Sequence, residues 1–235
     1  MNPVRRMAFD IETQSNPDRI NDLPEPDVAT GNLKDPVKIA EKVKEAKAKQ
    51  LDKLALDPHF GRVICISIAQ RDAGDGGQIV GETALRLDMG EADRDDAESE
   101  LLKWFWDRVR NATHFVTYNG AGFDVPYLMR RSLLLGVRPA RIECGKYRVV
   151  ERGCEHLDLF QLLVETWGSY ASCSHNLRFM VSEFLREVCP YGDDLDKGEL
   201  GRLFEAKQFE IIKQVCTWDC MATLRLCEAV ESVYA

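Results

Sequence analysis

Two acidic residues stand one position apart in a short apolar segment near the start of the chain. Asp10 and Glu12 flank Ile11. Because side chains alternate along a strand, both carboxylates would lie on one face while Phe9 and Ile11 point into the core. Adjacent carboxylates repel each other, so burying them together is costly unless a cation lies between them. The pair predicts either a site for a hard divalent ion such as Mg²⁺ or Mn²⁺, or a strand end with both acids in water.

A third acid follows a turn rich in glycine. The stretch from Tyr118 to Asp124 contains Gly120 and Gly122, and Pro126 comes soon after it. Glycine lets the chain turn tightly after a strand, so Asp124 is expected at or near the start of a helix. Its carboxylate could cap that helix or bind a metal ion, since both roles need the same location.

A fourth acid lies in a long segment with helical spacing near the end of the chain. By i, i+3 and i+4 spacing, Asp219 shares one helical face with a mainly apolar set of residues. They are Ile212, Val215, Cys216, Thr223 and Leu226. A carboxylate on such a face is unfavourable unless it meets water, a partner or a metal, so of the four acids Asp219 is the hardest to explain by structure alone.

The elements that must position these acids follow from the spacing of apolar and turn residues. Strands are expected at 7–12, 62–69, 78–81 and 114–118, with a polar loop over 15–32 and a segment at 157–163 that begins as strand and continues as helix. Helices are expected at 37–54, 96–109, 125–135, 176–188 and 209–234, the first preceded by Asp35 as N-cap and by Pro36. This order predicts one α/β domain with a mixed sheet.

The acidic motifs, in this order and spacing, resemble the DEDD (DnaQ-like) superfamily of 3′–5′ exonucleases. Asp10–Ile11–Glu12 matches the first motif, Asn119 to Phe123–Asp124 the second, and Asp219 the third. The likeness is greatest to stand-alone and phage-type exonucleases related to the proofreading domains of family B DNA polymerases. It implies a ribonuclease-H-like fold, with a mixed five-stranded sheet flanked by helices and a lysine-rich helical insertion after the first strand.

The resemblance also implies a chemistry and a substrate. Two divalent cations, Mg²⁺ or Mn²⁺, would be held by Asp10, Glu12, Asp124 and Asp219, and would support hydrolysis of the terminal phosphodiester. The expected substrate is the 3′ end of single-stranded nucleic acid, DNA in preference to RNA. RNA stays open as a substrate, because nothing in the sequence recognises a 2′-hydroxyl. The residues expected to hold the terminal nucleotide are Thr13, Asn119 and Phe123.

One position departs from the family pattern. Val215 stands four residues before Asp219, where one subgroup of the family has a tyrosine that helps to position the attacking water. Two alternatives to the DNA exonuclease therefore stay open. The first is a catalytically weak protein that binds nucleic-acid ends or docks onto a partner, and the second is an RNA-trimming exonuclease of the same superfamily.

Composition limits the class of protein. The chain has 235 residues, 45% of them hydrophobic, a net charge of −8 and 8 cysteines without a C-x-x-C motif. Its length is typical of a single domain that needs no disulfides, and it has no apolar run of the ~18–20 residues that span a membrane. We expect a soluble cytoplasmic protein, one exonuclease domain over 1–235, with no membrane contact and with a homo-oligomer or a replication or repair partner as open options.

Two stretches are locally basic. Lys34 to Lys53, within the expected helical insertion at 23–57, contains seven lysines against four acids, and residues 130–152 contain seven basic residues against two acids. The first stretch could contact a polyanion or be an ordinary solvated helix. The second predicts either a local patch of phosphate contacts or a mixed surface.

Overall fold

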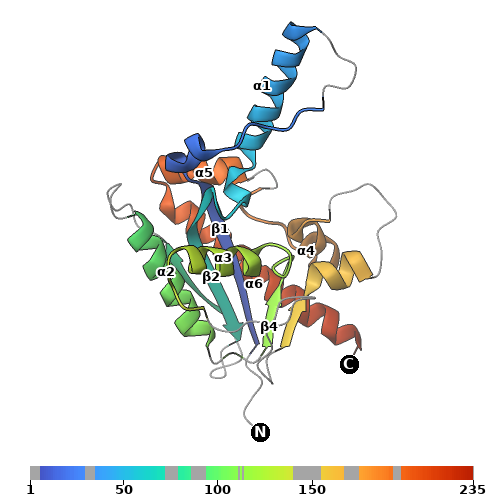
Figure 1. Cartoon of the computed structure of the whole chain (residues 1–235). Helices are drawn as coiled ribbons and strands as arrows, with labels where there is room; N and C mark the ends of the chain where they lie inside the picture. The colour runs from blue at the N-terminus through green and yellow to red at the C-terminus, as the bar shows by residue number, and fades with distance from the viewer. Residues whose placement is uncertain are drawn as a thin grey trace.

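A mixed sheet of five strands runs through the middle of the molecule (Figure 1). The computed structural model describes residues 6–29, 35–71, 79–85, 94–110, 112, 114–139, 155–166, 175–192 and 197–234. The strands are β1 (Arg6–Ser15), β2 (Gly61–Arg71), β3 (Ile79–Leu85), β4 (His114–Thr117) and β5 (Glu155–Asp158), in the order β3-β2-β1-β4-β5. β1 pairs antiparallel with β2 and parallel with β4. This confirms the predicted mixed α/β sheet and places β1 at its centre.

Helices cover both faces of this sheet (Figure 1). They are α1 (Pro36–Asp52), α2 (Arg94–Val109), α3 (Asp124–Leu134), α4 (Leu177–Leu185), α5 (Lys197–Glu205) and α6 (Phe209–Tyr234), with a π-helical turn at Gln161–Thr166 after β5. Phe9 and Ile11 of β1 pack on one face in a cluster with residues of α2 and α3. Ala8 packs on the other face, against α4 and α6. The alternation predicted for β1 is therefore confirmed.

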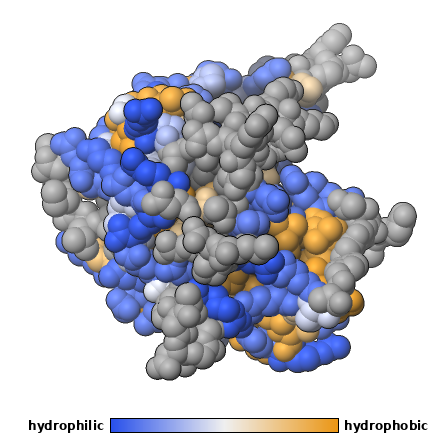
Figure 2. Space-filling view, turned by 90° about the horizontal axis from the view of Figure 1, so that it is seen from below, coloured by the Kyte–Doolittle hydropathy of each residue, from blue (hydrophilic) through white to orange (hydrophobic). Residues whose placement is uncertain are grey.

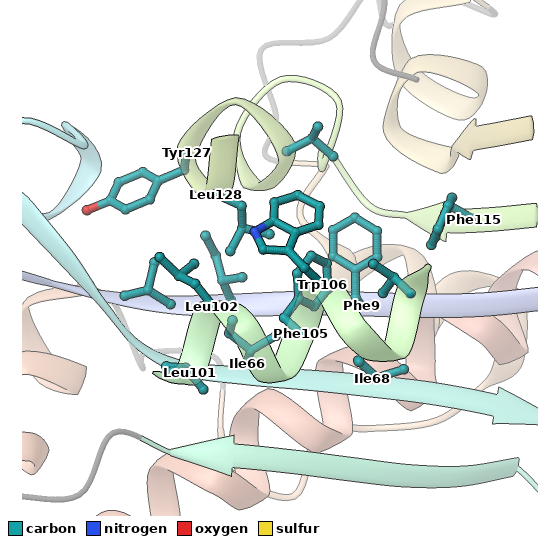
Figure 3. Packing of buried hydrophobic residues seen from close by; sticks show 14 of the residues in the cluster. Phe9, Ile66, Ile68, Leu101, Leu102, Phe105, Trp106, Phe115, Tyr127 and Leu128 are labelled. Carbon is teal, nitrogen blue, oxygen red and sulfur yellow. The ribbon is translucent and has the colours of Figure 1, made fainter. Parts of the chain in front are cut away.

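Aromatic residues fix β1 against the helices of the first face (Figure 3). The ring of Phe9 lies edge-on to Phe105 and Phe115, with centroids 5.2 and 5.8 Å apart. The buried Trp106 indole donates a hydrogen bond of 2.8 Å to the Ser132 hydroxyl, which joins α2 to α3. Truncating a buried phenylalanine of this kind costs about 3–5 kcal/mol, so this packing holds the strand that carries Asp10 firmly in place.

Several segments differ from the sequence-based expectation, among them β3, which runs to Leu85 and not only to residue 81. β1 runs on to Ser15, past a bulge between Glu12 and Thr13, because β2 continues to pair with it. Within the predicted loop, Pro17–Asp22 forms a 3₁₀ helix whose first turn is capped by the side chain of Asn16. α5 was not predicted, since two glycines interrupt its short sequence, yet its apolar residues pack on Ile212 and Cys216 of α6.

α1 extends away from the sheet and the helices that cover it (Figure 1). The side chain of Asp35 caps it by accepting a hydrogen bond of 3.0 Å from the Val37 N–H, as predicted. Lys47 of α1 forms an ion pair of 3.1 Å with Glu25 of the preceding segment. The helix expected after the first strand is confirmed, while the limits 23–57 for an insertion stay a prediction.

The coloured part of the face seen from below is mixed in character. Figure 2 shows hydrophilic residues there, with hydrophobic residues gathered in separate patches. Folded proteins keep much apolar surface exposed, so the patches do not by themselves indicate a partner. Among the described helices, none combines enough length with enough apolar character to cross a bilayer.

Candidate functional site

The acidic pair of β1 faces α6. Asp10 is partly buried and Glu12 is only 3% exposed, and their partners on β2 are Ser67 and Cys65. The Cys216 thiol of α6 lies 3.8 Å from the Oδ2 atom of Asp10. Both carboxylates thus project from the sheet toward the last helix, as the alternation of β1 predicts.

Asp124 joins this pair through the backbone of β1. β4 pairs with β1 only as far as Ala8, which leaves the backbone edge of β1 free of β4 at Ile11. The Ile11 N–H donates a hydrogen bond of 3.1 Å to the Oδ1 atom of Asp124, whose side chain is 5% exposed. Asp124 is the first residue of α3, and the N-cap is Phe123. The predicted position is confirmed, whereas the N-cap role proposed as an alternative is wrong.

Asp158, at the end of β5, fixes the turn that carries Asp124. Its carboxylate accepts hydrogen bonds of 2.8 Å from each of the Asn119 and Ala121 backbone N–H groups. It also accepts bonds from the N–H groups of Phe160 and Gln161. A buried carboxylate with several N–H donors is well satisfied, so Asp158 positions the turn between β4 and α3.

Asp219 approaches the same region from α6. The Cys220 thiol beside it donates a hydrogen bond of 3.1 Å to the carbonyl oxygen of Ala8 on β1. Burial raises the pKa of the Cys220 thiol well above its usual range, and the negative charges of Asp10, Asp219 and Asp124 raise it further. The segment of α6 that carries Asp219 therefore contacts β1 at Ala8, two residues before Asp10.

The donor atoms at this place suit a divalent cation. One ligand atom each from Asp10, Glu12 and Cys216 all lie within 4.8 Å of one another. Clustered carboxylates repel each other and are stabilised by a bound cation, and their hard oxygens favour Mg²⁺ or Mn²⁺. The residues present therefore fit a metal ion. Asp124 is linked to the same strand through the Ile11 N–H, and Asp219 follows Cys216 by three residues on α6.

A family comparison identifies the kind of domain. A family model described as a predicted 3′–5′ exonuclease related to the exonuclease domain of PolB matches residues 55–227. The chain belongs to this family. The matched range includes Asp124 and Asp219 and starts after Asp10 and Glu12, which the structure adds from β1. The resemblance to DEDD exonucleases of the family B polymerase type is confirmed.

Individual relatives are DNA polymerases. The chain is 34% identical over 85 residues to DNA polymerase 1 of Saccharolobus solfataricus (35% of this chain, 10% of that protein). It is 29% identical over 118 residues to a DNA polymerase of Pyrococcus glycovorans (45% of this chain, 15% of that protein). The family B DNA polymerase of Pyrobaculum calidifontis has the same fold over 96% of this chain and 24% of its own, with a TM-score of 0.60 and 20% identity. The chain thus spans a quarter or less of each of these proteins.

Val215 stands where one subgroup of the exonuclease family has a tyrosine. Its side chain is 1% exposed, so a buried apolar group occupies the position expected for a water-positioning tyrosine. It lies one helical turn before Asp219, on the same side of α6. A larger side chain at 215 would therefore have to displace packed neighbours.

The three residues expected to hold the terminal nucleotide have different surroundings. Asn119 is exposed and adopts a left-handed backbone conformation with φ of 65°. Phe123 is partly buried, and its ring centroid lies 5.4 Å from that of Tyr127. Thr13 is 0% exposed, and its Oγ1 atom has no hydrogen-bond partner among the described residues. Only Asn119 and Phe123 present side-chain surface in this structure.

The second basic stretch lies largely outside the described residues, which stop at 139 and resume at 155. Within the described part, Arg130 is exposed, but Arg131 is buried and pairs with Glu98 at 2.6 Å. Arg131 therefore stabilises the core and does not belong to a phosphate-contact patch.

The sequence did not predict Cys65 and Cys216 beside the acids, although Cys216 stands three residues before Asp219 on the same helical face.

Proposed function

We propose that this chain is a metal-dependent 3′–5′ exonuclease that removes nucleotides from the 3′ end of single-stranded DNA. The observation that carries the proposal is the hydrogen bond from the Ile11 N–H to Asp124, because Ile11 lies between Asp10 and Glu12. This bond ties the start of α3 to the strand segment that carries the acidic pair, and the Cys220 thiol next to Asp219 contacts Ala8 of the same strand, which supports a shared site. The exonuclease family and the DNA polymerase relatives support a DNA substrate.

The acids would divide between two cations. Asp10, Glu12 and Asp219 would hold one ion, and Asp10 with Asp124 would hold the second. Bound divalent ions lower the pKa of water and stabilise the charge that develops on a leaving oxygen. In the overall reaction one water molecule is consumed, the bond between phosphorus and the 3′ oxygen breaks, and a nucleoside 5′-monophosphate and a shortened strand with a free 3′-hydroxyl are released.

The chain's own groups orient the terminal nucleotide and the acids. Asn119 is exposed beside Asp124 and can donate or accept a hydrogen bond. The Phe123 ring could stack on a base, as aromatic side chains do in single-strand sites. Thr13 stays a candidate because it follows Glu12, although its side chain is buried. Asp158 holds the turn on which Asn119 and Phe123 stand.

The test is digestion of single strands labelled at the 5′ end, with Mg²⁺ or Mn²⁺. We expect a ladder of products shortened from the 3′ end. Asp10→Asn and Asp219→Asn should remove the activity, while Asp107→Asn, which changes an exposed acid of α2 that pairs with Arg110, should digest like the parent chain. If RNA is digested faster than DNA of the same sequence, the substrate is RNA.

No digestion of DNA or RNA with either ion would overturn the enzyme assignment. The end-binding alternative would then be examined by comparing the affinity for strands that end in a 3′-hydroxyl and in a 3′-phosphate.

A further inference from the structure

A buried thiol lies against the acidic pair of β1. The Cys216 sulfur is 3.6 Å from the carbonyl oxygen of Asp10 and 3.8 Å from its Oδ2 atom. Together with one oxygen each of Asp10 and Glu12, the sulfur forms a set of donor atoms within 4.8 Å of one another. Cys65 of β2, the register partner of Glu12, interacts with the same thiol.

The separation between the Cys216 sulfur and the Asp10 carboxylate is close to that of two ligands in a compact metal site. In a tetrahedral zinc site with Zn–S of about 2.3 Å and Zn–O of about 2.0–2.2 Å, neighbouring sulfur and oxygen ligands lie about 3.5 Å apart. The sulfur and the Asp10 Oδ2 atom are within a few tenths of an ångström of that separation. Glu12 supplies an oxygen within 4.8 Å of both atoms, so movement of the Glu12 side chain would let one ion contact all three.

We propose that Cys216 makes the metal site of this chain bind zinc-like divalent ions in competition with Mg²⁺ and Mn²⁺. The inference rests on the proposed function, because the same carboxylates serve both kinds of ion. Thiolate sulfur selects Zn²⁺ over hard ions, whereas Mg²⁺ takes oxygen ligands and leaves the thiol unused. When the ion binds, the thiol proton leaves to solvent and no oxidation state changes. Zinc-like ions thus occupy Asp10 and Glu12 and act as inhibitors of the exonuclease.

The test uses Co²⁺ as a spectroscopic probe of the zinc site, with the purified full chain and no nucleic acid. We expect the near-ultraviolet charge-transfer absorption of a thiolate–cobalt bond in the parent chain. Cys216→Ser should lose it, and the apparent Zn²⁺ affinity, measured against a chelator, should fall by about tenfold or more. The matched control is Cys227→Ser on the same helix, which should keep both the absorption and the affinity, since Cys227 packs in a different cluster.

X-ray absorption of the parent chain with one equivalent of Zn²⁺ gives a second measurement that needs no variant. One sulfur neighbour at about 2.3 Å is expected, and its absence, or a cobalt band that persists in Cys216→Ser, would overturn the inference. A chain that lacks nuclease activity but shows the sulfur neighbour would contradict only the proposed function. An active chain without that neighbour would contradict only the role of Cys216.

Discussion

The Oδ1 atom of Asp124 accepts a hydrogen bond of 3.1 Å from the backbone N–H of Ile11. This carboxylate satisfies a backbone donor that β4 does not reach, and that donor belongs to the residue between Asp10 and Glu12 in the sequence. Position 124 therefore combines a contribution to stability with the proposed binding of a cation, and substitutions can separate the two.

Asp124→Asn should separate charge from structure. The amide oxygen can still accept the Ile11 N–H, so the free energy of unfolding should stay within about 1 kcal/mol of the parent value. Nuclease activity should fall by about a hundredfold or more, because the ligand charge is lost. Asp124→Ala should lose the activity and also about 1–3 kcal/mol of stability, because the Ile11 N–H is left buried and unpaired. Urea unfolding and a single-strand digestion assay check both variants, and equal stability of the two would refute the role of the hydrogen bond.

For Asp158 we expect a large effect on stability and a small effect on ion binding. Its carboxylate accepts hydrogen bonds from the Asn119 and Ala121 N–H groups, in the turn between β4 and α3, and from the Phe160 N–H, just after β5. Asp158→Ala should lower the free energy of unfolding by about 2–4 kcal/mol, since several buried donors lose their acceptor. The affinity for Mn²⁺, measured by calorimetry, should change much less than in Asp10→Asn, because Asp158 is a positioning residue. A larger loss of ion affinity in Asp158→Ala than in Asp10→Asn would make Asp158 a metal ligand instead.

The strands and the acids could be predicted because their signals are local. Alternation places Asp10 and Glu12 on one face of β1, and helical spacing places Asp219 on the buried side of α6. The bond between Ile11 and Asp124 joins residues 113 positions apart, and it depends on where β4 ends beside β1. No local pattern carries that information.

The sequence also could not show which charged or polar residues are buried. Arg131 belongs to a stretch that looks like a basic surface, yet it is 5% exposed. Cys216 looks like an ordinary apolar helix residue, and only its contact with Asp10, 206 positions away in sequence, makes it chemically notable. Both depend on which elements pack together, which hydrophobic spacing alone leaves open.

The ion pair between Glu98 and Arg131 should be strongly coupled. Glu98 is 0% exposed, accepts the Arg131 Nε and Nη2 groups at 2.8 and 2.6 Å, and also accepts the Val63 N–H. Removing one partner leaves a buried charge, so Glu98→Ala or Arg131→Met should each cost about 3–5 kcal/mol of unfolding free energy. The double variant Glu98→Leu/Arg131→Met should cost clearly less than the sum of the single changes. A double-mutant cycle by urea unfolding measures the coupling, and additive losses would contradict it.

Alkaline pH should destabilise the fold. Burial, reinforced by the carboxylates of Glu231 and Glu228, raises the pKa of the Cys227 thiol to about 12, whereas an unfolded thiol titrates near about 8.5. Between these two pKa values the folded chain keeps a proton that the unfolded chain loses. The free energy of unfolding is therefore highest below about pH 8.5. It declines toward pH 12 by up to about 1.4 kcal/mol per pH unit for each such thiol. Unfolding free energies measured from pH 7 to 10.5 should show this decline, and Cys227→Ala should reduce the slope. An unchanged slope in Cys227→Ala would exclude a contribution of that thiol.

Val215 allows a direct test of the missing tyrosine. Because Val215 is 1% exposed, both Val215→Tyr and Val215→Phe should lower the free energy of unfolding by about 1–3 kcal/mol through overpacking. The two variants share nearly the same bulk and differ by one hydroxyl, so the ratio of their digestion rates isolates the effect of that group. Since position 215 lies one turn before Asp219, we expect Val215→Tyr to digest single strands about tenfold or more faster than Val215→Phe. Equal rates at saturating Mn²⁺ would mean that a hydroxyl at 215 does not reach the attacking water, and that this chain positions its water with another group.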